Sequence, residues 1–209
     1  MWCRRQYRLA MRWDKLFDDL ESQLEREITA DDLELDAEEE RLRLGRLSIR
    51  DRIVALHARS TAAAPLTLAV VLITGSRVTV RPVIIGRDWM SADIVDESGR
   101  PAQCIIPFAA LAGISLGASH IAPSLATTAE NGHPTLSQRL SVSYVLRDLC
   151  RRRRAVSLLL MAGEVYGTID RVGRDHVDIA VHERGAVRRE TAVSEYRLVP
   201  FSSLALVRL

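Results

Sequence analysis

The stretch Gly86-Arg87-Asp88-Trp89, followed by Pro107-Phe108-Ala109-Ala110-Leu111, decides how this chain of 209 residues is organised. The same pattern returns downstream as Gly173-Arg174-Asp175-His176 followed by Pro200-Phe201-Ser202-Ser203-Leu204, in the same order and at nearly the same separation. A repeated pattern identifies the folding unit before any single residue can be interpreted. The chain is therefore a tandem duplication.

Each copy is predicted to be a helix followed by five short strands. Apolar residues at helical spacing predict a helix over residues 47–58 and another over residues 136–150. Aliphatic and β-branched runs with turn signals follow each helix, and Pro82 interrupts its strand or places it at an edge because proline cannot donate to a ladder. The predicted domains are an arm at residues 1–46, a first unit at 47–116, a linker at 117–134 and a second unit at 135–209.

An acidic arm precedes a basic body. From Asp14 to Leu44 there are 13 acidic residues against 4 basic ones, whereas from Gly45 onward 21 basic residues meet 14 acidic ones. The arm is predicted to be an amphipathic helix, and a second acidic helix is expected to begin near Thr29 to Asp32. Its apolar stripe consists of Trp13, Leu16, Phe17, Leu20 and Leu24. The stripe docks on its own body, pairs with a second copy, or anchors a foreign protein partner.

Composition and motifs argue against several other classes of protein. The three cysteines have no close Cys-x-x-Cys spacing and the five histidines form no cluster, so we expect no disulfide scaffold, metal site or cofactor. The sequence has no nucleophile elbow and no phosphate-binding glycine loop, and we expect a protein that is not an enzyme. The longest apolar run, residues 65–73, is too short to cross a bilayer, which favours a cytoplasmic protein that does not contact a membrane.

The second copy resembles the Sm-like family, the fold of the bacterial Hfq protein and of the Sm and Lsm ring proteins. The resemblance lies in Leu146-Arg147-Asp148-Leu149 before residues 156–160, then Gly163-Glu164-Val165-Tyr166-Gly167-Thr168-Ile169, then Val172-Gly173-Arg174-Asp175-His176-Val177-Asp178-Ile179. A glycine lets the second strand of that family bend sharply, and Gly167 matches it, whereas Thr79 or Val80 stands near this place in the first copy. The whole layout, with an acidic leader that contains Trp13-Asp14-x-Leu16-Phe17-x-Asp19-Leu20-Glu21, also resembles an uncharacterised actinobacterial protein family.

Strand order and resemblance together predict an α+β fold that is mainly β. Five strongly bent strands and a helical turn before the last strand are the order of a small closed barrel, which removes its own sheet edges. We therefore expect acidic N-terminal helices followed by two tandem Sm-like barrels, each built from a helix and five strands. Such barrels associate through exposed strand edges, so a homo-oligomer is expected.

The Sm-like resemblance also implies a site for single-stranded RNA. In that family an aromatic or His side chain stacks on a base, and a nearby Asn or Asp bonds the base edge. The matching positions are Trp89, Ser91, His176 and Asp178, with Arg87 and Arg174 just before them for phosphate contacts. The alternatives without RNA are that Trp89 caps a barrel mouth and that Asp175 or Asp178 satisfies the His176 imidazole.

A run of four arginines, Arg151-Arg152-Arg153-Arg154, ends the predicted helix of the second copy. The run interacts favourably with the helix dipole, tracks phosphates along a nucleic acid, or pairs with the acidic arm within one chain or across a dimer. Two functions follow from the sequence, both without catalysis. One is an RNA-binding regulator; the other is a protein-protein adaptor that binds through the acidic N-terminal helix and uses the barrels as a dimerising body.

Overall fold

The computed structural model describes residues 3–95, 102–126, 136–185 and 190–209. It divides into two compact units, one that ends at Leu47 and one that runs from Ser48 to Leu209. We describe each unit by itself and call the second one the sheet body.

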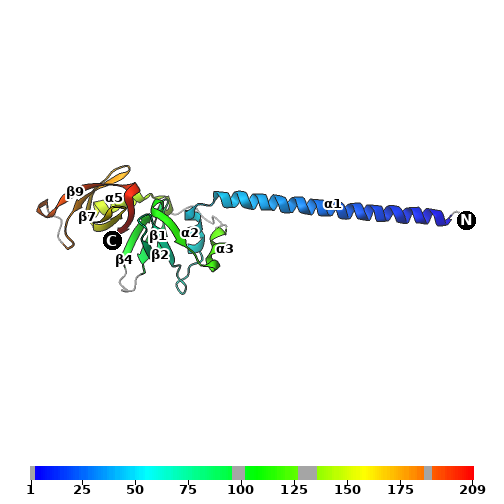
Figure 1. Cartoon of the computed structure of the whole chain (residues 1–209), viewed down its shortest axis with the longest axis horizontal. Coiled ribbons are helices and arrows are strands. Elements are labelled where there is room, and N and C mark those ends of the chain that lie inside the picture. The colour runs from blue at the N-terminus through cyan, green and yellow to red at the C-terminus, as the bar shows by residue number, and fades with distance from the viewer. Residues whose placement is uncertain (1–2, 96–101, 127–135, 186–189) are drawn as a thin grey trace. The chain divides into compact units, whose positions relative to one another are not determined.

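The first unit is one long helix. Helix α1 spans Cys3–Arg46 without interruption, as Figure 1 shows. The predicted break near Thr29 to Asp32 is therefore wrong. Leu, Glu and Arg, which fill this segment, are strong helix formers, and their summed propensity overrides a local capping signal from Thr or Asp. Exposed ion pairs between Glu38 and Arg41 and between Glu40 and Arg43 add support one turn apart.

The first half of the sheet body begins with helix α2, Ile49–His57. Its start is fixed by a capping box, in which Ser48 accepts from the Asp51 N–H and Asp51 accepts from the Ser48 N–H. The strands that follow are β1 (Leu68–Leu72), β2 (Arg77–Ile85), β3 (Trp89–Ile94), β4 (Ala102–Pro107) and, after the short helix η1 (Phe108–Ala110), β5 (Leu111–Ser115).

The second half repeats this succession of elements. Its helix α5 spans Val142–Arg151, after helix α3 (Ala118–Leu125) and the single turn α4 (Leu136–Arg139). The strands are β6 (Ala155–Leu160), β7 (Gly163–Val172), β8 (His176–Val181), β9 (Glu195–Pro200) and β10 (Leu204–Arg208), with short helices η2 (Glu190–Ala192) before β9 and η3 (Phe201–Ser203) before β10.

All ten strands form one antiparallel sheet with the order β5-β1-β2-β3-β4-β10-β6-β7-β8-β9. Each half has the same internal order, but neither closes on itself, because β10 of the second half pairs with β4 of the first. The prediction of two tandem Sm-like barrels is therefore wrong: the body is a single open sheet whose outer strands are β5 and β9. The base-contacting positions inferred from a barrel lose the geometry on which they depended.

Two apolar cores lie on this sheet and interlock where the halves meet. The second-half core includes Leu146, Leu158 and Ile179, and it takes up Trp89 and Ile105 from the first half. The first-half core includes Ile53, Val70 and Ile106, and it takes up Ala205 and Leu206 from β10. Exchange of apolar side chains between the halves makes the junction part of the core.

Three further expectations differ from the structure in detail. The described part of the predicted linker contains helix α3, whose Ser124 hydroxyl accepts two hydrogen bonds from Arg52 of α2, while residues 127–135 lie outside the described part. The helix expected over residues 136–150 is split into α4 and α5. Strand β2 lies inside the sheet, and the register with β3 shifts just after Pro82, so the chain accommodates the missing donor with a bulge.

Candidate functional site

The indole ring of Trp89 is sealed between the two halves. Trp89 begins β3, is 5% exposed and packs in the second-half core. Its Nε1–H donates to the Leu140 carbonyl at 2.9 Å, and the Arg87 N–H donates to the same oxygen at 3.2 Å. The face that an RNA base would need is therefore buried, and Trp89 is a structural contact in this arrangement.

The carboxylate of Asp88 adds a second bond across the junction. Its Oδ1 accepts from the Val142 N–H at 2.8 Å. Val142 is the first residue of α5, whose own N-cap, Ser141, makes no side-chain capping bond. Asp88 thus supplies the cap from the other half of the body, where a negative charge also suits the helix dipole.

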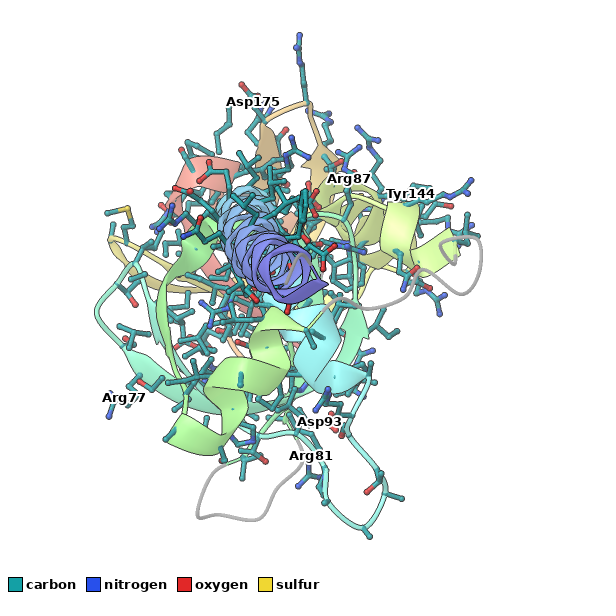
Figure 2. The ribbon with its side chains drawn as sticks, turned by 90° about the vertical axis from the view of Figure 1, so that its right-hand side faces the viewer. Arg77, Arg81, Arg87, Asp93, Tyr144 and Asp175 are labelled. Carbon is teal, nitrogen blue, oxygen red and sulfur yellow. The ribbon has the colours of Figure 1, made fainter. Side chains whose placement is uncertain are left out.

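The other two predicted positions of the first copy contribute little to a binding slot. Ser91 lies within β3 opposite Ile84 and Ile105 and is partly buried. The Arg87 guanidinium is mostly exposed and lies 3.8 Å from the Asp88 carboxylate. Figure 2 shows Arg87 at the surface of the sheet body, on the same side as Asp175 of the second copy.

In the second copy, His176 lies between two carboxylates. Its Nδ1 is 2.8 Å from Asp175 Oδ1, and its Nε2 is 3.9 Å from Asp178 Oδ1. The hydrogen bond from His176 lowers the pKa of Asp175 below its usual value. Asp178 is largely buried, and its Oδ1 has no hydrogen-bond partner among the described residues, while its Oδ2 is 3.7 Å from Arg171. Asp175 thus satisfies the Nδ1 atom of the imidazole, whereas Nε2 lies beyond hydrogen-bond distance of Asp178.

The repeated glycine of the motif has the same physical reason in both copies. A Cβ added to Gly86 would lie 2.2 Å from Trp89 Nε1, and one added to Gly173 would lie 2.4 Å from His176 Cε1. In each copy the aromatic ring folds back over the glycine three residues earlier. The Gly-Arg-Asp-aromatic pattern is therefore a turn that seats a ring.

The arginine run at the end of α5 is partly neutralised. Arg151 and Arg152 both bind Asp148 at 2.6 Å, which lowers the pKa of that carboxyl, and Arg153 binds Asp170 at 3.1 Å. Arg154 is exposed and, within the described parts of the chain, makes no ion pair; the same holds for Arg147 on α5. The patch keeps two guanidinium groups for an external anion. Arg174 is exposed in the turn before β8.

Helix α1 carries the predicted partner-binding stripe. Phe17, Leu20 and Leu24 are 57%, 50% and 57% exposed. Trp13 and Leu16 belong to the same helix, one turn before them. The described part of the stripe is therefore an apolar strip on an otherwise acidic helix.

Two features were not identified from the sequence. The Asp88 cap had a visible signal, since Asp follows Gly-Arg in both copies, but its target lies far along the chain. The outer strand β9 exposes Tyr196 and Leu198, and strand periodicity alone carries no information about which strand ends the sheet.

Comparison of the chain with protein families, with curated proteins and with solved structures gives no match. Among the described residues, no helix is both long and apolar enough to pass through a membrane. The described residues also contain no group of three or more His, Cys, Asp or Glu side chains arranged to hold a metal ion.

Proposed function

We propose that this protein is a non-enzymatic adaptor in which helix α1 binds a protein partner. The observation that carries the proposal is the exposure of Leu20 and Leu24 on one stripe of α1. In the sheet body, by contrast, large aliphatic residues of this kind are buried in the two apolar cores. An amphipathic helix with such a stripe binds in an apolar groove of a partner.

The charge of α1 defines the chemistry of that partner. The arm has 13 acidic residues against 4 basic ones between Asp14 and Leu44. A groove with an apolar floor and a basic rim therefore complements it, and the rim charges speed association at low salt.

The test compares two double variants of the full chain in native cells. Leu20→Gln/Leu24→Gln removes the stripe with residues that favour helix, and Asp18→Gln/Arg26→Gln changes the opposite helical face without altering net charge. We expect a partner protein to cross-link to the wild type and to the control variant. The same partner should not be recovered with the stripe variant. Purified partner should then bind the stripe variant at least about tenfold more weakly, a loss of about 1.4 kcal/mol. Equal recovery with all three chains contradicts the proposal.

A second candidate function, binding of single-stranded RNA, is favoured by the exposed Arg147 and Arg154 on the α5 side of the body. It no longer includes base stacking on Trp89. Phosphate contacts by two arginines should steepen the fall of affinity with salt by about 0.7 each on a log–log plot.

The RNA candidate is tested with labelled oligouridine and oligoadenine over a salt series. Arg147→Gln/Arg154→Gln should weaken binding and flatten the salt slope, whereas Arg77→Gln/Arg81→Gln should do neither. Figure 2 shows Arg77 and Arg81 well separated from Tyr144 of α5, so this pair is a matched control for charge. Equal losses from both pairs, or no binding at low salt, contradict this function.

A further inference from the structure

The two outer strands of the sheet are the repeat counterparts of two strands that pair at its centre. Strand β9 matches β4, because each ends in the proline of a Pro-Phe turn, and β5 matches β10, because each follows that turn. At the centre, β4 and β10 pair with each other. At the two ends, β5 pairs only with β1 and β9 only with β8 among the described residues.

The central junction shows what these strands do when they meet. Val207 lies opposite Ile105 and Arg208 opposite Cys104, and the Leu209 N–H donates to the Gln103 carbonyl at 2.9 Å. Ile105 is 2% exposed there. The strand pairing and the burial of Ile105 occur together.

The ends carry the same strands without their partners. Leu198 is the counterpart of Ile105, at the second position before the proline, and it is 67% exposed. Ile114, the counterpart of Val207, is only half-buried. Tyr196 on β9 is 58% exposed. Strand β9 carries Glu195, Arg197 and Pro200, residues of the kinds that protect sheet edges, but its exposed Tyr196 and Leu198 leave apolar surface on which the strand of another chain can pair.

A second contact at the junction also has counterparts in the repeat, and Asp175, which bonds His176 through Oδ1, does not make this contact within the described part of the chain. Asp88 accepts from the Val142 N–H at the start of α5. Its counterpart Asp175 is exposed, with a side chain that is 85% accessible. The counterpart of Val142 is Ile49, the first residue of α2, and the Ile49 N–H makes no hydrogen bond within the described residues.

We propose that a second copy of this chain docks head to tail, with its β5 against β9 of the first copy. The register repeats that of the central junction, so that Ile114 lies opposite Leu198 and Ser115 opposite Arg197. Asp175 of one copy then accepts from the Ile49 N–H of the other. Glu195 already pairs with Arg197 on β9 and neutralises the one guanidinium of this strand.

This contact joins two different surfaces, so every copy keeps one unused end after each step. Such a heterologous interface closes into a ring when the rotation between copies allows it and otherwise grows as a chain. The inference concerns the sheet body and is independent of what α1 binds.

The experiment uses two edge variants of the full chain, Leu198→Lys on β9 and Ile114→Lys on β5. Molar mass is measured by light scattering from about 1 to about 100 µM, since association follows mass action. The wild type should exceed the monomer mass of 23.3 kDa, and each variant alone should remain a monomer. The control Met161→Lys, at an exposed apolar residue in the turn between β6 and β7, should behave as wild type.

Mixing the two variants gives the decisive result. Each retains one intact edge of opposite kind, so an equimolar mixture should form a dimer of one copy of each variant and no larger species. Circular dichroism of each variant checks that the fold is kept. A monomeric wild type overturns the proposal, and so do single variants that keep the wild-type mass or a mixture that stays monomeric.

Discussion

The same four-residue turn seats two different rings with two different outcomes. In both copies the ring folds back over a glycine, but Trp89 reaches the Leu140 carbonyl of the other half, whereas His176 bonds Asp175 in its own turn. Indole has a large apolar surface and one donor, which suits a buried position with a single acceptor. Imidazole has two polar atoms, and the His176 ring stays half-exposed at the surface.

Substitutions of Trp89 should destabilise the sheet body, and the loss should be larger when more of the side chain is removed. Trp89→Phe keeps an aromatic ring and loses one hydrogen bond; because Leu140 still accepts from the Arg87 N–H, we expect a loss of about 1 kcal/mol. Trp89→Ala should cost about 3 to 5 kcal/mol. His176→Ala, at a half-exposed ring, is the comparison and should cost less than about 1 kcal/mol. Urea unfolding measures all three, and equal values for Trp89→Ala and His176→Ala would refute the sealed position of Trp89.

Gly167 is needed because β8 passes directly over it. A Cβ at this position would lie 2.2 Å from the Ala180 carbonyl oxygen, and this backbone atom cannot rotate away. We expect Gly167→Ala to destabilise the body by about 1 to 3 kcal/mol. Gly113→Ala in β5, where nothing lies within 4 Å, should be neutral or slightly stabilising. Thermal unfolding compares them, and a neutral Gly167→Ala would contradict the close approach of the strands.

The counterpart of Gly167 follows from the strand register. Gly167 lies opposite Val156 and Val181, and in the first half Val80 lies opposite Leu68 and Ile94. Val80 therefore occupies the position that the sequence left open between Thr79 and Val80. The first half accommodates the buried β-branched side chain of Val80 at this position, whereas the second half has room only for glycine. The periodicity of the sequence does not reveal this difference in local strand separation.

At the scale of elements, the junction of β4 and β10 contains a buried thiol. Cys104 lies opposite Arg208 and is fully buried, and burial raises the pKa of its thiol to about 12. Only the thiolate reacts with alkylating agents, so the closed junction protects Cys104 by exclusion and by pKa. Cys150, on α5, is only half-buried.

Alkylation with iodoacetamide near pH 8, followed by peptide mass spectrometry, should therefore label Cys150 well before Cys104. Leu206→Ala removes an apolar contact that β10 makes in the first-half core, and it should speed labelling of Cys104 by at least about tenfold, because a core truncation of this kind costs 2 kcal/mol or more. Labelling of Cys104 as fast as that of Cys150 in the wild type would mean that the halves separate readily.

The positions of the strands could be predicted from the sequence, but whether the strands of each half close into a barrel could not. Turn residues such as Thr74-Gly75 and the Pro-Phe pairs set strand ends, and these local signals placed ten strands close to where they lie. A closed barrel and an open sheet share the same order within each half, since they differ only in whether the last strand meets its own fourth strand or that of the neighbour. That choice is made by Ile105, Leu206 and Trp89 packing across the junction. It depends on long-range contacts, which the repeat cannot encode.

For the whole molecule, the sheet body provides folding stability, and helix α1 carries the apolar stripe proposed to bind a partner. Both apolar cores are built from residues of the sheet body. The sheet body therefore carries its own folding free energy, while α1 relies on helix propensity and on whatever covers its stripe.

A chain shortened to residues 48–209 should accordingly fold as well as the full protein. It begins at Ser48, so the capping box of α2 is retained. We expect its thermal midpoint, followed by tryptophan fluorescence of the buried Trp89, to lie within about 3 °C of the full chain, which corresponds to about 1 kcal/mol for a domain of this size. The helical signal of α1 in the full chain should melt gradually, because a single helix without a core unfolds with low cooperativity. A drop of 10 °C or more would instead place the apolar stripe of α1 on its own body, and the adaptor proposal would fail with it.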